Sequence, residues 1–148
     1  MFGLSFRETM SGGYHLCTSP DVDRPMRFTV RASIDSLRSL LGNAVFTLQG
    51  AVLAEGLADH KRLDGTLTID PLRAKLLVYV FRFEGNDGAP LTFQGRKTLS
   101  EGSLLHAMTV LPGGIFDAAG HRVGEALLRF DLRSDLLKFL RSFTFTRA

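Results

Sequence analysis

Short stretches of alternating apolar and polar residues, separated by turn sequences, most strongly limit the folds open to this chain. In residues 26–32, Met, Phe, Val and Ala alternate with Arg, Thr and Arg, as in a strand with one buried face. Residues 76–84 form a nearly continuous run of β-branched and aromatic residues typical of a strand, and 91–98 are its expected partner strand, joined to it by the hairpin-type sequence Gly-Asn-Asp-Gly at 85–88. Because no βαβ alternation follows, the pattern predicts an antiparallel sheet.

The remaining segments extend this pattern over one domain, residues 1–148. A short first strand is expected before a turn at Gly12-Gly13, and 19–25 is expected to be a loop. Residues 59–61 are expected to be loop-like, and Gly113-Gly114 to be a turn. Further strands are expected at 44–53, 63–69, 104–111 and 123–132, short helices at 34–41 and 134–143, and a possible final strand at 143–147.

About eight strands with hairpin-type links favour a closed barrel, because internal glycines such as Gly50 allow long strands to bend. We therefore predict an all-β, lipocalin-like (calycin-like) antiparallel barrel carrying two short helices. The hydrophobic content of 45% is sufficient for a core of this size.

The distribution of charge and the lack of a recognisable targeting segment limit the functions to be expected. The net charge is +3, and the basic residues are scattered along the sequence, so we expect no nucleic-acid partner. The N-terminus resembles no signal peptide and no apolar run is long enough to span a bilayer, so a cytoplasmic protein without a transmembrane segment is expected. Cys17 is the only cysteine, which excludes an intrachain disulfide, and we expect it to be a small buried residue.

Motifs for catalysis and cofactors are missing from the sequence. The four histidines have no metal-ligand spacing, and neither a nucleophile motif nor a dinucleotide fingerprint occurs. The sequence therefore predicts no catalytic residues, no metal and no cofactor, and leaves enzyme activity open.

Phenylalanine is unusually frequent, with twelve residues against two tyrosines and no tryptophan. These rings fit an ordinary aromatic core, and they also fit the lining of an apolar cavity, since an eight-stranded barrel can hold one small ligand. The residues predicted to line such a cavity are Tyr79, Phe81, Phe83 and Phe93. Arg82, Gln94 and Lys97 are candidate polar contacts, although alternation turns Arg82 and Gln94 away from the adjacent phenylalanines.

Several stretches resemble a module associated with glucose–methanol–choline oxidoreductases of the cholesterol-oxidase kind and with their fused hydrolase relatives. The matching residues are Phe-Arg-Glu-Thr-Met-Ser-Gly at 6–12, Gly-Thr-Leu-Thr-Ile at 65–69, Leu-Thr-Phe-Gln-Gly-Arg-Lys at 91–97, Gly-Glu-Ala-Leu-Leu at 124–128 and 135–143. The resemblance implies a β-barrel accessory domain linked to lipid or sterol metabolism, with an oxidoreductase as a possible partner. The resemblance identifies no catalytic residue in this sequence.

Three functions remain open at this point. The first is a non-catalytic module that binds a hydrophobic small molecule, such as a lipid or sterol, and serves a metabolic enzyme. The second is a protein-interaction domain with a filled barrel, and the third is a small barrel cyclase or isomerase. A cavity that contains a histidine or carboxylate with a shifted pKa would favour the third.

Overall fold

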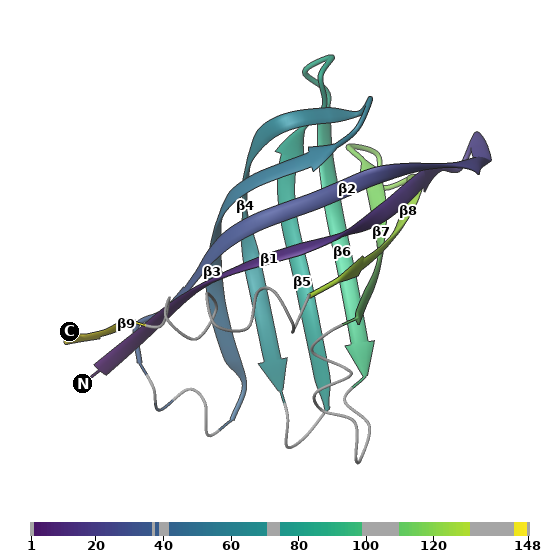
Figure 1. Cartoon of the computed structure of the whole chain (residues 1–148). Coiled ribbons are helices and arrows are strands. Elements are labelled where there is room, and N and C mark those ends of the chain that lie inside the picture. Colours follow the sequence, from purple (N-terminus) through teal and green to yellow (C-terminus); the bar gives the residue numbers. More distant parts are fainter. Residues whose placement is uncertain are drawn as a thin grey trace.

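The described residues of the computed structural model, 2–36, 38, 42–70, 75–98, 110–130 and 144–147, form one antiparallel sheet. Figure 1 shows the strands wrapped around a common interior. The strands are β1 (Phe2–Leu16), β2 (Ser19–Ile34), β3 (Ala44–Ala54), β4 (Ala58–Asp70), β5 (Leu76–Glu84), β6 (Pro90–Thr98), β7 (Val110–Asp117), β8 (Arg122–Arg129) and β9 (Thr144–Arg147).

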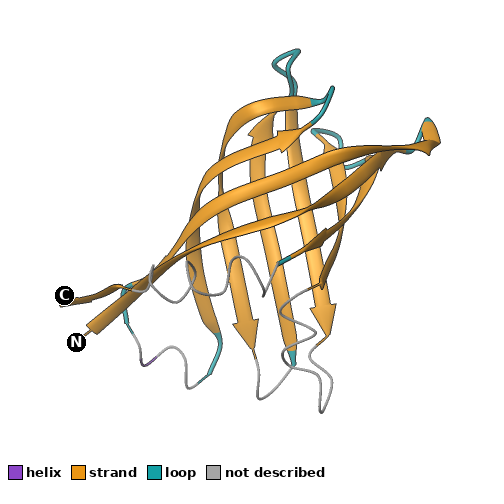
Figure 2. Ribbon diagram, in the orientation of Figure 1, coloured by secondary structure: helices purple, strands orange, loops and turns teal. Residues whose placement is uncertain are grey.

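The sheet closes because β1 pairs on both of its sides. Ser11 lies opposite Arg27 of β2 and also opposite Arg129 of β8, so the first and eighth strands join. The ninth strand adds to the start of β1, where Leu4 pairs with Phe145. The predicted all-β antiparallel barrel is confirmed as a closed barrel of eight strands with one extra strand (Figure 2).

The hairpin turn predicted at 85–88 is confirmed, and a second hairpin turn joins β7 to β8. The β5–β6 turn ends at Gly88 and the β7–β8 turn at Gly120, and both glycines have φ near +83°, a conformation that favours glycine. In the second turn, Asp117 Oδ1 accepts hydrogen bonds from the backbone N–H groups of Ala119 (3.0 Å) and His121 (2.9 Å). The bond from His121 is the main cause that lowers the pKa of Asp117, and these bonds fix the turn.

The strand ends predicted from glycine and proline were wrong in β1 and β7. β1 continues through Gly12-Gly13, and β7 continues through Pro112-Gly113-Gly114, where turns were expected. A Cβ at position 12 would lie 2.1 Å from the carbonyl oxygen of Leu127, so this glycine permits a close approach of β8 to β1. The glycines therefore belong to close strand contacts, and the turn-based interpretation was wrong for them.

Two predicted loops also belong to strands. Residues 19–25 form the start of β2, and 59–61 lie in β4, because the hairpins turn earlier, at 17–18 and 55–57. Cys17, expected to be buried, is exposed in the first of these turns, where its backbone N–H donates to the carbonyl of Val123. The β1–β2 ribbon is thus longer than the sequence indicated.

The helix predicted at 34–41 starts at Ile34, which instead ends β2, and its residues 37 and 39–41 lie outside the described ranges. The helix predicted at 134–143 and most of the strand predicted at 104–111 also lie outside them. The alternative of a final strand at 143–147 is confirmed by β9. No helix in the part of the chain that the structure describes has the length and apolar character needed to cross a membrane.

The core lies inside the barrel and is formed by alternate, inward-facing residues of β1 to β8. Its centre is a cluster of rings from β2, β5 and β6, in which the Phe81 and Phe93 centroids lie 4.8 Å apart and Phe28 lies 5.1 Å from Phe81. We call Phe28, Phe81 and Phe93 the aromatic plug. All three have no exposed surface, so this part of the barrel is filled.

Candidate functional site

The four aromatic residues predicted to line a cavity all point into the barrel. Tyr79, Phe81 and Phe83 come from alternate positions of β5, and Phe93 faces Phe81 from β6. Phe81 and Phe93 belong to the aromatic plug, and Phe83 packs on Phe81 with ring centroids 5.9 Å apart. Phe81 therefore packs on both Phe83 and Phe93, while Tyr79 lies at the lower edge of the plug.

The three polar candidates do not lie together: two are on the outer wall and one faces the interior. Arg82 and Gln94 are exposed on the outer wall, as strand alternation requires, and each lines a shallow surface hollow. Lys97 shares the inward face of Phe93 and Gly95, lies opposite Leu77 and is partly buried. A molecule inside the barrel would therefore meet Lys97 and not the other two.

The lower interior differs from the plug above it. We use this term for the inward-facing residues Phe6, Glu8, Leu77, Tyr79 and Lys97, on the side of the plug nearest the end of β4 and the start of β5. Phe6 is 7% exposed and Leu77 5%, whereas the plug residues are 0% exposed. Glu8 and Lys97 keep still more accessible surface. The lower interior is therefore less completely enclosed than the plug.

A carboxyl–phenol pair lies at the boundary between plug and lower interior. Glu8 of β1 shares the inward face of Phe6 and Met10, and Tyr79 reaches toward it from β5. The Tyr79 hydroxyl donates a hydrogen bond of 2.5 Å to Glu8 Oε1. The Tyr79 ring also packs on Phe28 of the plug, with centroids 5.7 Å apart. The pair is thus positioned by β1 and β5, and the Tyr79 ring is packed against Phe28.

The surroundings of this pair change its acid–base properties. Removal from water raises the pKa of Glu8 from 4.5 to about 7, against the opposing effect of the hydrogen bond from Tyr79. Burial, followed by the charge of Glu8, raises the pKa of Tyr79 well above 10.0. Near neutral pH, Glu8 therefore exists in both protonation states, and Tyr79 stays a neutral donor.

The sequence contained a signal for Glu8 that the motif search did not use. Glu8 is in phase with Leu4, Phe6 and Met10, so strand alternation places it on the apolar face. Its partner could not be found from spacing, because Tyr79 lies on a strand that is not adjacent to β1 in the sheet.

The other polar contacts are structural. The Tyr14 hydroxyl donates to the backbone carbonyl of Glu55 at 2.5 Å, tying β1 to the β3–β4 hairpin. His15 lies near Asp23 and Glu125 at the protein surface, with N–O distances of 3.9 and 3.4 Å. Within the described residues, no three His, Cys, Asp or Glu side chains gather as ligands for a metal ion.

Comparison of the chain with models of protein families, with curated proteins and with solved structures gives no match. The resemblance to a module associated with oxidoreductases therefore stays an expectation from the sequence. The function has to be argued from the barrel interior itself.

Proposed function

We propose that this barrel is a binding module for a hydrophobic small molecule with one polar group, such as a lipid or sterol. The observation that carries the proposal is the Glu8–Tyr79 pair, which lies among aromatic and aliphatic side chains of the lower interior, with Lys97 as the other inward-facing polar residue and with Glu8 only partly buried. Small-molecule sites commonly combine apolar walls with a few placed polar groups.

The pair supplies both kinds of hydrogen-bonding group. Because Tyr79 uses its proton on Glu8, its oxygen can accept a bond from a ligand hydroxyl. Protonated Glu8 can donate to a ligand carbonyl or hydroxyl, and ionised Glu8 can accept. Phe6 and Leu77 would contact the apolar body of the ligand, and Lys97 would face its outer end. Ligand contacts of Phe81, Phe83 and Phe93 would require movement in the plug.

The resemblance in sequence suggests where such a module would act. An accessory barrel linked to lipid or sterol oxidation would present or retain a poorly soluble substrate for a partner oxidoreductase. This part of the proposal depends on the resemblance alone, and co-purification with a flavin-dependent partner would test it separately.

Native mass spectrometry of freshly purified protein, compared with the denatured mass, tests the binding function. We expect an adduct on the folded protein, or saturable uptake of a fluorescent sterol or fatty acid by emptied protein. Glu8→Gln and Tyr79→Phe should weaken uptake at least several-fold, since a lost polar contact costs about 1 kcal/mol or more. Glu84→Gln removes a carboxylate from the exposed end of β5 and is the matched control. Absence of both adduct and uptake would overturn the proposal.

The same pair favours a second candidate, a small barrel isomerase. A carboxyl group with a pKa of about 7 can take a proton from a substrate and return it near neutral pH. In an unconjugated enone, Glu8 would remove the proton between the two functional groups and redeliver it at the far alkene carbon. The Tyr79 hydroxyl would keep its hydrogen bond to Glu8 and hold the carboxylate in position for the transfer. Ultraviolet absorbance of the conjugated product would report this reaction, and its loss in Glu8→Gln with ligand binding retained would identify it.

A further inference from the structure

Lys97 turns a positive charge toward the lower interior. Strand alternation along β6 puts this residue in phase with Phe93 and Gly95, both of which face inward. Its neighbours Arg96 and Thr98 are exposed on the outer wall, whereas Lys97 is partly buried. The lysine side chain therefore starts inside the barrel wall, unlike the arginine beside it.

The side chains next to Lys97 on the inward face are apolar. Ile69 of β4 lies opposite Leu77 of β5, and Leu77 lies opposite Lys97. One inward position higher, a Cβ on Gly95 would lie 2.9 Å from side-chain atoms of Leu111, so Leu111 occupies the space that this glycine leaves. An ammonium group among apolar side chains loses part of its hydration, and an anionic partner offsets that loss.

The carboxylates of the described strands do not supply such a partner. Among the described residues, no Asp or Glu forms an ion pair with Lys97. Asp70 lies in the next row, opposite Leu76, where strand alternation turns it outward. Glu8 faces the interior, but it accepts the hydrogen bond of Tyr79. The anionic group of a ligand can therefore take this position beside Lys97.

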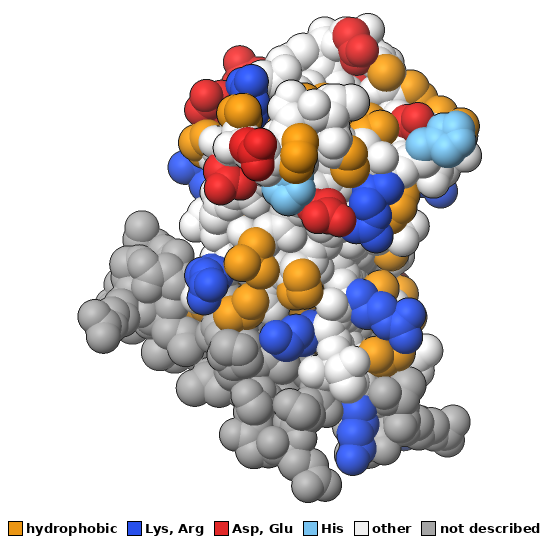
Figure 3. All heavy atoms as spheres, turned by 90° about the vertical axis from the view of Figure 1, so that its right-hand side faces the viewer, with side chains coloured by type: hydrophobic (Ala, Val, Ile, Leu, Met, Phe, Trp, Pro, Cys, Tyr) orange, Lys and Arg blue, Asp and Glu red, His pale blue; other side chains and the backbone are white. Residues whose placement is uncertain are grey.

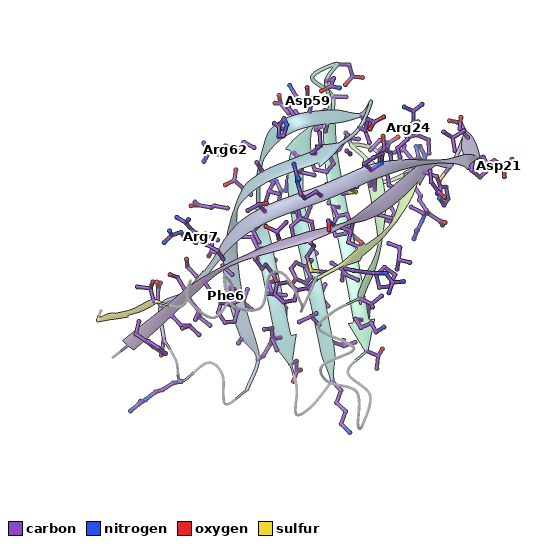
Figure 4. All side chains as sticks on the ribbon, in the orientation of Figure 1. Phe6, Arg7, Asp21, Arg24, Asp59 and Arg62 are labelled. Carbon is purple, nitrogen blue, oxygen red and sulfur yellow. The ribbon has the colours of Figure 1, made fainter. Side chains whose placement is uncertain are left out.

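The interior is less completely enclosed at its lower end than at its upper end. Tyr14 and Ala58, near the upper hairpins, are 1% and 0% exposed, whereas Leu4 and Phe6 are 8% and 7% exposed. Figure 4 labels Phe6 on the lower part of β1 and Asp59 at the upper end. On the face drawn in Figure 3, acidic side chains gather in the upper part and the described charged side chains below them are basic. These basic side chains favour the approach of an anionic molecule to the lower end on this face.

The two polar positions of the lower interior lie at different depths. Lys97 follows two residues after Gly95, which lies opposite Tyr79, and two strand residues span about 7 Å. A ligand with an apolar body longer than this spacing can contact both positions. Ionised Glu8 would repel a carboxylate beside it, so the acid group of such a ligand belongs at Lys97.

We infer that the ligand of this barrel is an amphiphilic hydroxy or oxo acid, whose carboxylate is bound by Lys97 while its hydroxyl or carbonyl group contacts the Glu8–Tyr79 pair. The inference rests on the proposed function and names the class of ligand more closely. A neutral sterol or alcohol has a group for the pair, but it leaves Lys97 without an anion.

Titration calorimetry with matched acids and methyl esters tests the contact with Lys97. The probes are ω-hydroxydecanoate and deoxycholate, each compared with its own methyl ester, so that both a chain and a steroid body are included. For at least one pair, we expect the acid to bind about tenfold more tightly, because a hydrogen bond to a charged group is stronger than one between neutral groups. Lys97→Met should remove this preference, and Lys97→Arg should keep it.

Arg96→Gln is the matched control, because it removes the same charge from the adjacent, outward-facing position. This variant should keep the preference for the acid. Binding of the methyl ester, which does not need the charge, should be retained in every variant and shows that each one is folded.

Decanoate, which lacks the hydroxyl group, tests the inner contact. ω-Hydroxydecanoate should bind several-fold more tightly than decanoate to the parent protein. Tyr79→Phe should reduce this advantage, whereas Lys97→Met should lower the binding of both acids and leave the advantage in place.

The remaining outcomes separate the inference from the proposed function. If esters or a neutral sterol bind but the acids bind no more tightly, or if the preference for the acid survives Lys97→Met, the inference is wrong and the binding function stands. An equal loss of preference in Arg96→Gln would assign it to the general charge of the wall and would also refute the inference. If acids, esters and sterol all fail to bind, the proposed function fails as well.

Discussion

Replacing Glu8 by glutamine should make the barrel more stable at pH 8 and should remove most of the fall in stability between pH 4.5 and 7. Glutamine keeps an oxygen that can accept the Tyr79 hydrogen bond, but it cannot ionise. In the parent protein, the folded state binds more protons than the unfolded state in this window, because burial raises the pKa of Glu8. Stability therefore decreases as the pH rises toward 7 and becomes level above it.

The size of this effect follows from the same pKa. Each pKa unit corresponds to about 1.4 kcal/mol, so a rise from 4.5 to about 7 disfavours the ionised folded state by about 3 kcal/mol. Glu8 keeps some contact with solvent, which reduces the penalty, so we expect a gain of about 1 to 3 kcal/mol for Glu8→Gln at pH 8. Below pH 4.5, the two proteins should differ little.

Urea unfolding at several pH values between 4 and 8 measures this prediction directly. Glu84→Gln is the control, since it removes an exposed carboxylate from the same barrel and should leave the pH dependence unchanged. Tyr79→Phe removes the hydrogen bond that lowers the pKa of Glu8, so the fall in stability should extend to higher pH. An unchanged pH dependence in Glu8→Gln would refute the assignment of Glu8 to a desolvated position.

Three further substitutions test the packing. Gly65→Ala should destabilise the barrel by about 1–3 kcal/mol in denaturant unfolding, because the added Cβ would lie 2.0 Å from the carbonyl oxygen of Val80. Gly42→Ala is the control, since no atom lies within 4 Å of its added Cβ. Phe28→Ala should cost about 3–5 kcal/mol by opening a cavity in the plug, and a loss below 1 kcal/mol would contradict its packing there. Tyr14→Phe should cost about 1 kcal/mol, measured by urea unfolding, through loss of its bond to a hairpin carbonyl.

The fold was predictable where short-range rules decide the structure. Alternation in 26–32, the β-branched and aromatic residues of 76–84 and the Gly-Asn-Asp-Gly turn are local features of the sequence, and they indicated an antiparallel barrel. Strand ends were harder to predict, because Gly12 and Gly113 have the composition of turns but lie within strands. Their role depends on how closely another strand approaches, and the local sequence carries no information about that distance.

The site was predictable only in part. Alternation identifies Tyr79 as inward-facing, and the same rule applied to Glu8 would have found the carboxylate. The contact between them depends on barrel closure, which brings β1 and β5 to face each other across the interior. The approach of Arg7 and Arg31 was missed for a related reason, because they become neighbours only through strand register.

Closure through β1 also sets the order in which the barrel can form. The β1–β2 ribbon needs only a local turn, whereas the β1–β8 seam joins residues from opposite ends of the chain. Pairings distant in sequence form slowly because a long loop must first be closed. Until the seam forms, β1 and β8 expose unpaired backbone groups that can add strands from other molecules. The free side of β1 in this open intermediate is therefore where aggregation of the folding chain should begin.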